Sequence, residues 1–254
     1  MASLSCQVQT WGTVILIELS SQVVGEEKLR VAADEAQQFL LKIDRLFSTY
    51  RSDSQVSEIR AGQLDIAGAD PLVKEVWDSC LLARELTDGA FDPWKVDGGF
   101  DPSGFVKGWA ADKCGDIFDN YEIENSLVNA AGDISVRGGL LADGVARPWP
   151  LQIRNPEKFD EVVKDVPLHE GAIATSGVGE KGSHIRDPFT GLIAIGALSA
   201  TVIGPDGGLA EALATALVVA GKDGAGWFNK PELADYSAFV IDRHSDTSWE
   251  ISNQ

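Results

Sequence analysis

The stretch EEKLRVAADEAQQFLLKIDRLF, residues 26–47, predicts a long amphipathic α-helix. Its apolar residues recur every three or four positions, which places them on one face of a helix. They are Leu29, Ala32, Ala36, Leu40, Ile43 and Phe47. A helix with a single apolar face needs a second surface to bury that face, so we expect it to lie on a β-sheet.

Segments on both sides of this helix predict the strands of such a sheet. Residues 8–19, VQTWGTVILIEL, contain aromatic and β-branched residues and predict one strand. Residues 126–138, SLVNAAGDISVRG, predict a hairpin that turns at Ala131-Gly132-Asp133. Further strands are expected at residues 149–154, at 192–203 and, as the last strand of the chain, at 237–242.

Three more helices are expected. One begins at Asp70-Pro71 and ends at Thr87-Asp88-Gly89, a second covers residues 105–118, and a third carries Glu211 and Thr215. Strands and helices alternate irregularly rather than as repeated βαβ units, so the sequence predicts an α+β fold. Because no internal repeat, low-complexity tract or clear linker interrupts the chain, we expect one domain over residues 1–254.

The composition limits the kinds of partner. The chain has 254 residues, of which 44% are hydrophobic, and this is ample for a sizeable buried core. Its 39 acidic residues outnumber 21 basic ones, giving a net charge of −18. Such a surface repels a phosphate backbone, so we expect no nucleic-acid partner. An acidic protein that binds a pyrophosphate needs local positive charge, and a metal ion is the simplest source.

Cysteines and hydropathy predict the compartment. Cys6, Cys80 and Cys114 are odd in number and widely spaced, which is typical of reduced thiols in a cytoplasmic protein. The apolar run at residues 14–17 is too short for a signal sequence or a membrane span. Cys6 lies near the start, but no hydrophobic leader precedes it to support lipidation. We therefore expect a cytoplasmic protein with no membrane span.

The segment HIRDPFTG, residues 184–191, combines groups that are suited to ligand binding. His184 is one of three histidines and can move a proton near neutral pH, and Asp187 is placed to orient it. A lone loop histidine is also compatible with a structural or solvated role. Both interpretations stay open from the residues alone.

Two further segments carry chemistry. Gly104, Lys107 and Gly108 open a helix whose free amides suit a phosphate, although neither a Walker loop nor a dinucleotide fingerprint is present. The same glycines are also consistent with close packing of the helix on the sheet. Glu211 and Thr215 share one helix face and present oxygen ligands for magnesium. A dipole-favoured glutamate and a threonine bonded to its own helix explain this pair equally well.

Tyr50 follows the first long helix, within Ser48-Thr49-Tyr50. A tyrosine at this position is able to stack on a flat ring, or to lie at the rim of a site without touching a ligand.

The order of these segments resembles that of the FAD:protein FMN transferase family, also called ApbE. The counterparts of its motifs are Trp11-Gly12-Thr13, Ser48-Thr49-Tyr50, Gly89-Ala90-Phe91-Asp92-Pro93, Asp101 to Asp112, Asn129 to Asp133, Thr175-Ser176-Gly177, His184 to Gly191, and Thr201-Val202 leading into Ala210 to Leu217. Eight short motifs in the same order are far more specific than any one of them.

The resemblance implies a two-lobed α+β fold with FAD in a cleft between the lobes. It implies magnesium-dependent transfer of FMN from FAD to a Ser or Thr hydroxyl of an acceptor flavoprotein, with release of AMP. The implied FAD contacts are Trp11, Tyr50, Ala90, Phe91, Asp92, Asp101, Lys107 and Ser176. The implied metal ligands are Glu211, Thr215 and the carbonyl of Gly104, and His184 or else Asp187 is the implied catalytic base.

Several positions depart from the family pattern. Glu211 replaces the usual aspartate, Trp11 replaces a methionine, and Asp101-Pro102-Ser103-Gly104 replaces the usual DLGG. The chain is also shorter than the lipid-anchored members of the family, and no leader like theirs is expected. The resemblance is to a short form without the lipoprotein leader. Two alternative functions remain: a pyrophosphatase that splits FAD into FMN and AMP, and a flavin-binding protein without catalysis.

Overall fold

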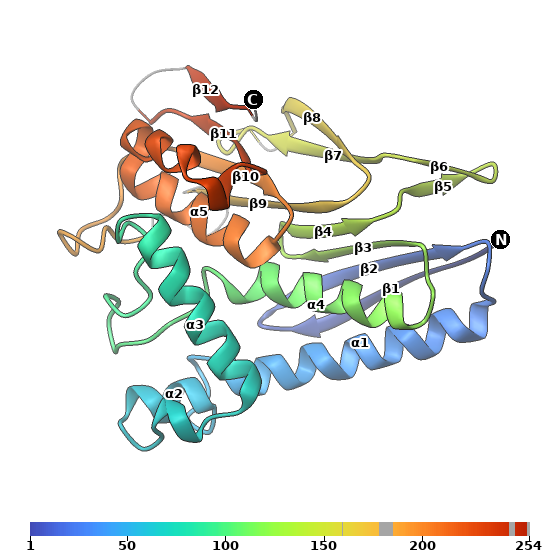
Figure 1. Ribbon diagram of the computed structural model, residues 1–254, viewed down its shortest axis with the longest axis horizontal. Helices are drawn as coiled ribbons and strands as arrows, with labels where there is room; N and C mark the ends of the chain where they lie inside the picture. Colours follow the sequence, from blue (N-terminus) through green and yellow to red (C-terminus); the bar gives the residue numbers. More distant parts are fainter. Residues whose placement is uncertain (159, 178–184, 244–246, 253–254) are drawn as a thin grey trace.

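Among the described residues, the core of the fold is an antiparallel sheet of eight strands (Figure 1). The computed structural model describes residues 1–158, 160–177, 185–243 and 247–252. In spatial order the strands are β1 (Ala2–Thr10), β2 (Thr13–Ser21), β3 (Asn125–Ala130), β4 (Asp133–Arg137), β9 (Gly171–Gly177), β10 (Ser199–Gly204), β11 (Ser237–Ile241) and β12 (Ser248–Ile251). The combination of α-helices with an antiparallel sheet confirms the predicted α+β class.

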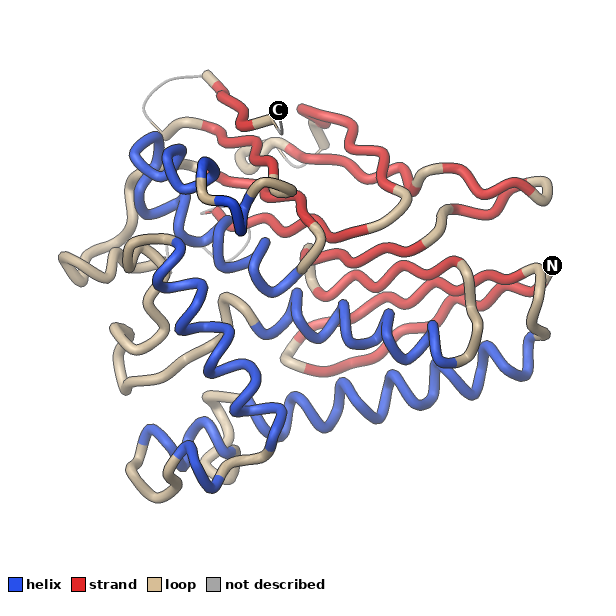
Figure 2. The backbone as a smooth tube through the Cα atoms, in the orientation of Figure 1, coloured by secondary structure: helices blue, strands red, loops and turns tan. Residues whose placement is uncertain are grey.

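The helices gather on one face of this sheet (Figure 2). They are α1 (Glu26–Phe47), α2 (Gln55–Arg60), α3 (Pro71–Leu86), α4 (Val106–Asn120) and α5 (Gly207–Ala220), with short 3-10 segments at Ile66–Gly68, Gly221–Asn229 and Pro231–Leu233. Helix α1 packs on β1, α4 on β3 and β4, and α5 on β9 and β10, while α3 packs against α5. The three helices against the sheet bury their apolar faces there, as the periodicity of residues 26–47 predicts.

The opposite face of the sheet is partly covered by two small antiparallel pairs. Strands β5 (Leu140–Ala142) and β6 (Val145–Arg147) form one pair, and β7 (Trp149–Arg154) and β8 (Val162–Leu168) form the other. Trp149, Leu151 and Ile153 of β7 pack with Val136 and Phe239 of the main sheet in a second, smaller core. The sheet is thus buried on both faces where β7 packs on it, whereas alternate residues of β1 stay exposed.

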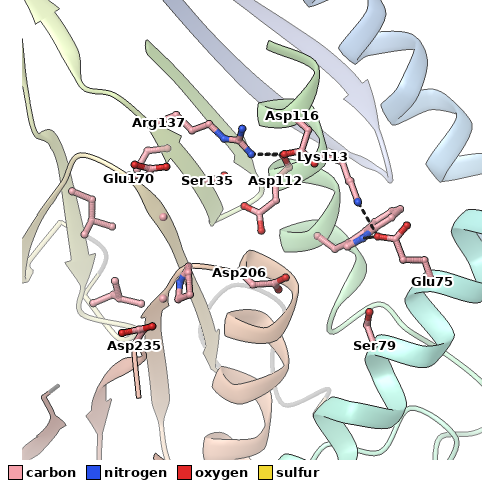
Figure 3. A pocket seen from close by; sticks show the side chains of 17 residues that line it. Glu75, Ser79, Asp112, Lys113, Asp116, Ser135, Arg137, Glu170, Asp206 and Asp235 are labelled. Carbon is pink, nitrogen blue, oxygen red and sulfur yellow. Dashed lines mark hydrogen bonds and ion pairs between the residues drawn. The ribbon is translucent and has the colours of Figure 1, made fainter. Parts of the chain in front are cut away.

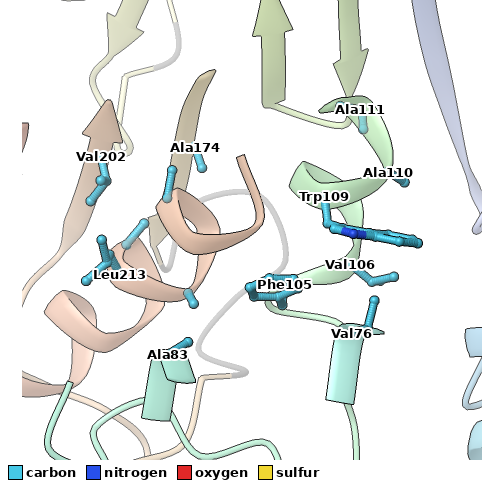
Figure 4. Packing of buried hydrophobic residues seen from close by; sticks show 14 of the residues in the cluster. Val76, Ala83, Phe105, Val106, Trp109, Ala110, Ala111, Ala174, Val202 and Leu213 are labelled. Carbon is cyan, nitrogen blue, oxygen red and sulfur yellow. The ribbon is translucent and has the colours of Figure 1, made fainter. Parts of the chain in front are cut away.

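Helices α4 and α5 cross at a contact between glycines. A Cβ atom added to Gly108 would overlap the carbonyl oxygen of Gly207, and one added to Gly207 would lie 2.7 Å from the carbonyl oxygen of Gly108. Beside this contact, Phe105 packs between α4 and α5, whereas Trp109 packs against aromatic rings of α1 and Leu213 points toward β10 (Figure 4). Gly108 therefore is a close-packing residue, but it packs against another helix rather than against the sheet.

Most of the expected elements are present, but the sequence did not predict α2, β5, β6, β8 or β9. Helix α1 has the expected bounds, α3, α4 and α5 lie where they were expected, and β3 and β4 form the predicted hairpin. The predicted single strand at 8–19 is wrong, because Trp11 (φ 53°) and Gly12 (φ 67°) form a tight turn between β1 and β2. Strand β10 begins only at Ser199, and β12 follows the expected last strand.

Candidate functional site

Residues that are far apart in the sequence lie at the same end of the sheet. The pairing Ile15↔Ala130 places the β1–β2 turn beside the β3–β4 turn. The pairings Ile134↔Ile173 and Ser199↔Gly177 place the end of β9 and the start of β10 at the same end. Antiparallel pairing thus places Trp11, Asp133 and Ser176 at the same end of the sheet.

Lys107, in the first turn of α4, is held in a closed network. Its Nζ contacts Glu211 Oε1, lies 2.7 Å from Asp133 Oδ2 and donates to the carbonyl oxygen of Ser103 at 3.3 Å. An ammonium has three N–H donors, so each has an acceptor. Burial alone lowers the pKa of Lys107, but the carboxylates of Asp133 and Glu211 outweigh it and hold the pKa above its usual range.

Glu211 projects from α5 toward α4. Its side chain is 3% exposed, Oε1 contacts Lys107, and Oε2 accepts a hydrogen bond of 3.0 Å from the backbone N–H of Gly108. Burial, followed by the nearby carboxylate of Asp133, raises the pKa of Glu211, while Lys107 acts in the opposite direction. Both carboxylate oxygens of Glu211 are therefore already used by groups of α4.

Thr215, one turn further along α5, belongs to a second cluster. Its Oγ1 lies 2.9 Å from Oγ of Ser176 at the end of β9. A Cβ atom added to Gly104 would lie 3.4 Å from the same oxygen and 3.3 Å from the Phe91 ring. The structure therefore brings together the predicted residues Gly104, Ser176 and Thr215, and the absence of a side chain at Gly104 keeps the Thr215 hydroxyl open on that side.

These oxygens are suitable in type for magnesium, which prefers carboxylate, hydroxyl, carbonyl and water ligands. Within the described residues, however, no group of three or more His, Cys, Asp and Glu side chains is arranged to hold a metal ion. Glu211 supplies the single carboxylate among the three predicted metal ligands, and this carboxylate is paired with Lys107. The residues therefore fit a divalent ion only if Lys107 releases Glu211.

Ala90, Phe91 and Asp92 lie deeply in the protein. They are 3%, 4% and 5% exposed, and Asp92 pairs with Arg84 at 2.8 Å. Asp101 is half-buried and accepts hydrogen bonds from the N–H and hydroxyl of Ser103, which shapes the loop before α4. Each of these residues thus has a structural role in the protein. A contact between these residues and FAD remains a prediction.

The two predicted aromatic contacts differ in exposure. Tyr50 is 99% exposed in the loop after α1, so its ring is available for stacking. Trp11 is half-buried in the β1–β2 turn and packs against the main core. Its left-handed backbone conformation is uncommon for a residue with a large side chain.

Asp187 closes the turn that contains Phe189 and Thr190. Its Oδ1 accepts from the backbone N–H of Phe189 at 2.8 Å, and its Oδ2 accepts from the Thr190 hydroxyl at 2.9 Å. Both oxygens thus have a structural task. The other predicted catalytic residue, His184, lies outside the described residues.

Sequence reasoning did not assign Asp133. Its side chain is 5% exposed, and its carboxylate is one of the two that hold Lys107. The signal in the sequence was its position, because Asp133 ends the Asn129–Asp133 segment at the hairpin turn, but its burial became evident only in the structure.

A cavity of about 730 Å³ lies at the start of α5 (Figure 3). Its polar lining includes Glu75, Asp112, Arg137, Glu170 and Asp206 and contains none of the predicted site residues. Asp112 there accepts from the N–H of Gly207 at the start of α5, and burial raises the pKa of Asp112 to about 6. This hydrogen bond explains the buried carboxylate as a helix cap.

Comparison with known proteins agrees with the sequence resemblance. The profile of the ApbE family matches residues 11–96 and 94–239. An FAD:protein FMN transferase of Vibrio cholerae is 37% identical over 134 residues, which cover 48% of this chain and 39% of the relative. One from Rhodobacter capsulatus is 36% identical over 132 residues, covering 48% and 24%. The matched part thus spans less than half of either curated relative.

Solved structures share the fold over nearly the whole chain. The flavin transferase ApbE from Vibrio cholerae superposes with a TM-score of 0.84 at 23% identity, covering 99% of this chain and 97% of that one. The ApbE protein from Thermotoga maritima gives 0.80 at 26% identity, covering 94% of each. Fold and site together define an α+β protein in which helix starts and strand ends converge at one end of an antiparallel sheet. This chain belongs to the ApbE family.

Proposed function

We propose that this protein transfers FMN from FAD to a Ser or Thr hydroxyl of an acceptor flavoprotein and releases AMP. The family match over residues 11–96 and 94–239, together with the convergence of Gly104, Ser176 and Thr215, is the observation that carries this proposal. The curated relatives are named FAD:protein FMN transferase, which supports the transfer of FMN from FAD to a protein. We also propose that residues 1–254 form one domain and that the protein is cytoplasmic.

No membrane partner is part of this proposal. Within the part of the chain that the structure describes, each helix is too short or too polar to cross a membrane.

In this reaction the acceptor hydroxyl attacks the FMN-side phosphorus of FAD in line with the departing AMP. The new P–O bond forms as the bond to the AMP phosphate breaks, and the hydroxyl proton passes to a base, for which we propose His184. Ser176 and Thr215 offer two hydroxyl groups, 2.9 Å apart, that can hydrogen bond to phosphate oxygens. Their fixed positions on β9 and α5 would orient the diphosphate for attack.

Magnesium belongs to the same proposal. Gly104, Glu211 and Thr215 would hold it, and when bound it would neutralise charge on the diphosphate. Lys107 lies in the first turn of α4, next to these residues, and supplies positive charge in a strongly acidic chain. The proposed role of Lys107 as an FAD contact requires that it exchange at least one of its present acceptors for a phosphate oxygen.

The substitution Thr215→Val tests the site assignment. It keeps the shape of the side chain but removes the hydroxyl, and we expect the rate of FMN transfer to fall about tenfold or more. The rate is measured from covalently bound flavin on an acceptor flavoprotein, with AMP release followed in parallel. AMP release without bound flavin in the wild-type protein would favour the pyrophosphatase instead.

Thr201→Val is the matched control. Thr201 of β10 forms an equivalent hydroxyl pair, 2.9 Å from Thr175, and Thr175 points to the opposite face of β9 from Ser176. The same atoms are removed from the same kind of pair, so we expect the rate of transfer to stay near that of the wild type. Equal losses in both variants would remove Thr215 from the proposed site.

A further inference from the structure

The Lys107 network is an unusual arrangement for a proposed cation site, because a cation of the protein itself already fills it. The ammonium of Lys107 lies between the carboxylates of Asp133 and Glu211. The side chains of the three residues are 20%, 5% and 3% exposed. Two carboxylates and one ammonium carry a net charge of −1 in a place where water can screen little of it.

Glu211 reaches this network because of its direction and length. It lies on the face of α5 that meets the start of α4, and its two oxygens are used by Lys107 and by the N–H of Gly108. Thr215, one turn away, is instead hydrogen bonded to Ser176. An aspartate at position 211 would be shorter by one methylene and could not place its oxygens at the same points without moving the backbone.

We infer that Lys107 is an internal competitor of a divalent cation at Glu211, so that a metal ion binds there only when the ammonium leaves this carboxylate. Two positive charges within a few ångströms of one buried carboxylate repel each other strongly. Magnesium also requires a carboxylate oxygen that is free to coordinate it. The paired state therefore keeps the affinity for metal low, and an anion that draws Lys107 away would raise it.

This inference deepens the metal part of the proposed function, but its test uses neither FAD nor an acceptor. Mn²⁺ alone is the probe, and its binding to the whole protein is followed by the loss of the free-ion signal in electron paramagnetic resonance. For Lys107→Met we expect Mn²⁺ to bind about tenfold or more tightly than to the wild type, because the competitor is gone and two carboxylates remain. A protein without transferase activity can still give this result.

Lys28→Met is the matched control. It removes the same charge from the chain and breaks the ion pair of Lys28 with Glu122, whose carboxylate is 75% exposed. The change in net charge is identical, so we expect Mn²⁺ affinity to remain that of the wild type. An equal gain in both lysine variants would show a general charge effect and would overturn the inference.

Glu211→Asp provides a second variant that keeps every charge. It shortens the carboxylate away from Lys107 and retains a metal ligand, so we expect Mn²⁺ to bind several-fold more tightly than to the wild type. A gain in this variant alone would also follow from ligand geometry, because aspartate is the residue that the family pattern has at this position. Lys107→Gln, which keeps a polar side chain without the charge, therefore decides the question if Lys107→Met does not fold. Mn²⁺ affinity no higher than that of the wild type in the folded variants would overturn the inference.

Discussion

Gly108→Ala is expected to destabilise the protein by about 2 kcal/mol or more, measured as the free energy of unfolding in urea. The added methyl group would overlap the carbonyl oxygen of Gly207, and that atom belongs to the backbone of the crossing helix. A backbone cannot rotate away as a long side chain can, so α4 and α5 must separate. The intrinsic helix preference of alanine offsets only about 1 kcal/mol of this loss.

Gly226→Ala is the control for that substitution. A Cβ atom at Gly226 meets nothing within 4 Å, and its φ angle is outside the left-handed region. We expect its free energy of unfolding to stay within about 0.5 kcal/mol of the wild type. Equal stabilities of the Gly108 and Gly226 variants would contradict the close crossing. The crossing matters for function because α4 carries Lys107 and α5 carries Glu211 and Thr215.

His184→Ala is expected to lower kcat for FMN transfer roughly a hundredfold while FAD binding stays nearly unchanged. A general base acts on the proton of the attacking hydroxyl, so its loss affects the chemical step more than ligand binding. We propose His184 rather than Asp187 as the base, because both carboxylate oxygens of Asp187 accept hydrogen bonds within the turn at Phe189 and Thr190. Stopped-flow kinetics and a separate titration with FAD measure the two quantities.

His169→Ala is the matched substitution. The Nδ1 atom of His169 lies 2.8 Å from the carbonyl oxygen of Gly138, so this histidine has a structural partner. We expect its removal to leave kcat close to that of the wild type. If the loss of His184 weakens FAD binding as much as it slows transfer, His184 positions the ligand and is not the base.

Periodic features of the sequence predicted the helices well. Residues 26–47 have one apolar stripe, and Pro71 follows a capping Asp70, so local chemistry alone sets the limits of α1 and the start of α3. The strand at 8–19 failed for a local reason as well. Its β-branched residues favour strand on both sides of Trp11-Gly12, and the turn was hidden because tryptophan is rare at positive φ.

Some residues of the candidate site were named from the sequence, but their contacts were not. The order of the motifs named Gly104, Ser176 and Thr215, and the structure brings them together. Sequence could not show that Lys107 pairs with Glu211, because their positions are 104 residues apart and their contact depends on the crossing of α4 and α5. Long-range pairing of this kind is decided by tertiary packing, which helix period and spacing do not encode.

The mass of an acceptor flavoprotein after incubation with this protein, FAD and Mg²⁺ tests the central claim most directly. We predict a gain equal to one FMN joined through a phosphoester to a Ser or Thr side chain, with one AMP released for each adduct. An unmodified acceptor, under conditions in which another ApbE transferase modifies it, would contradict the assignment of transferase activity.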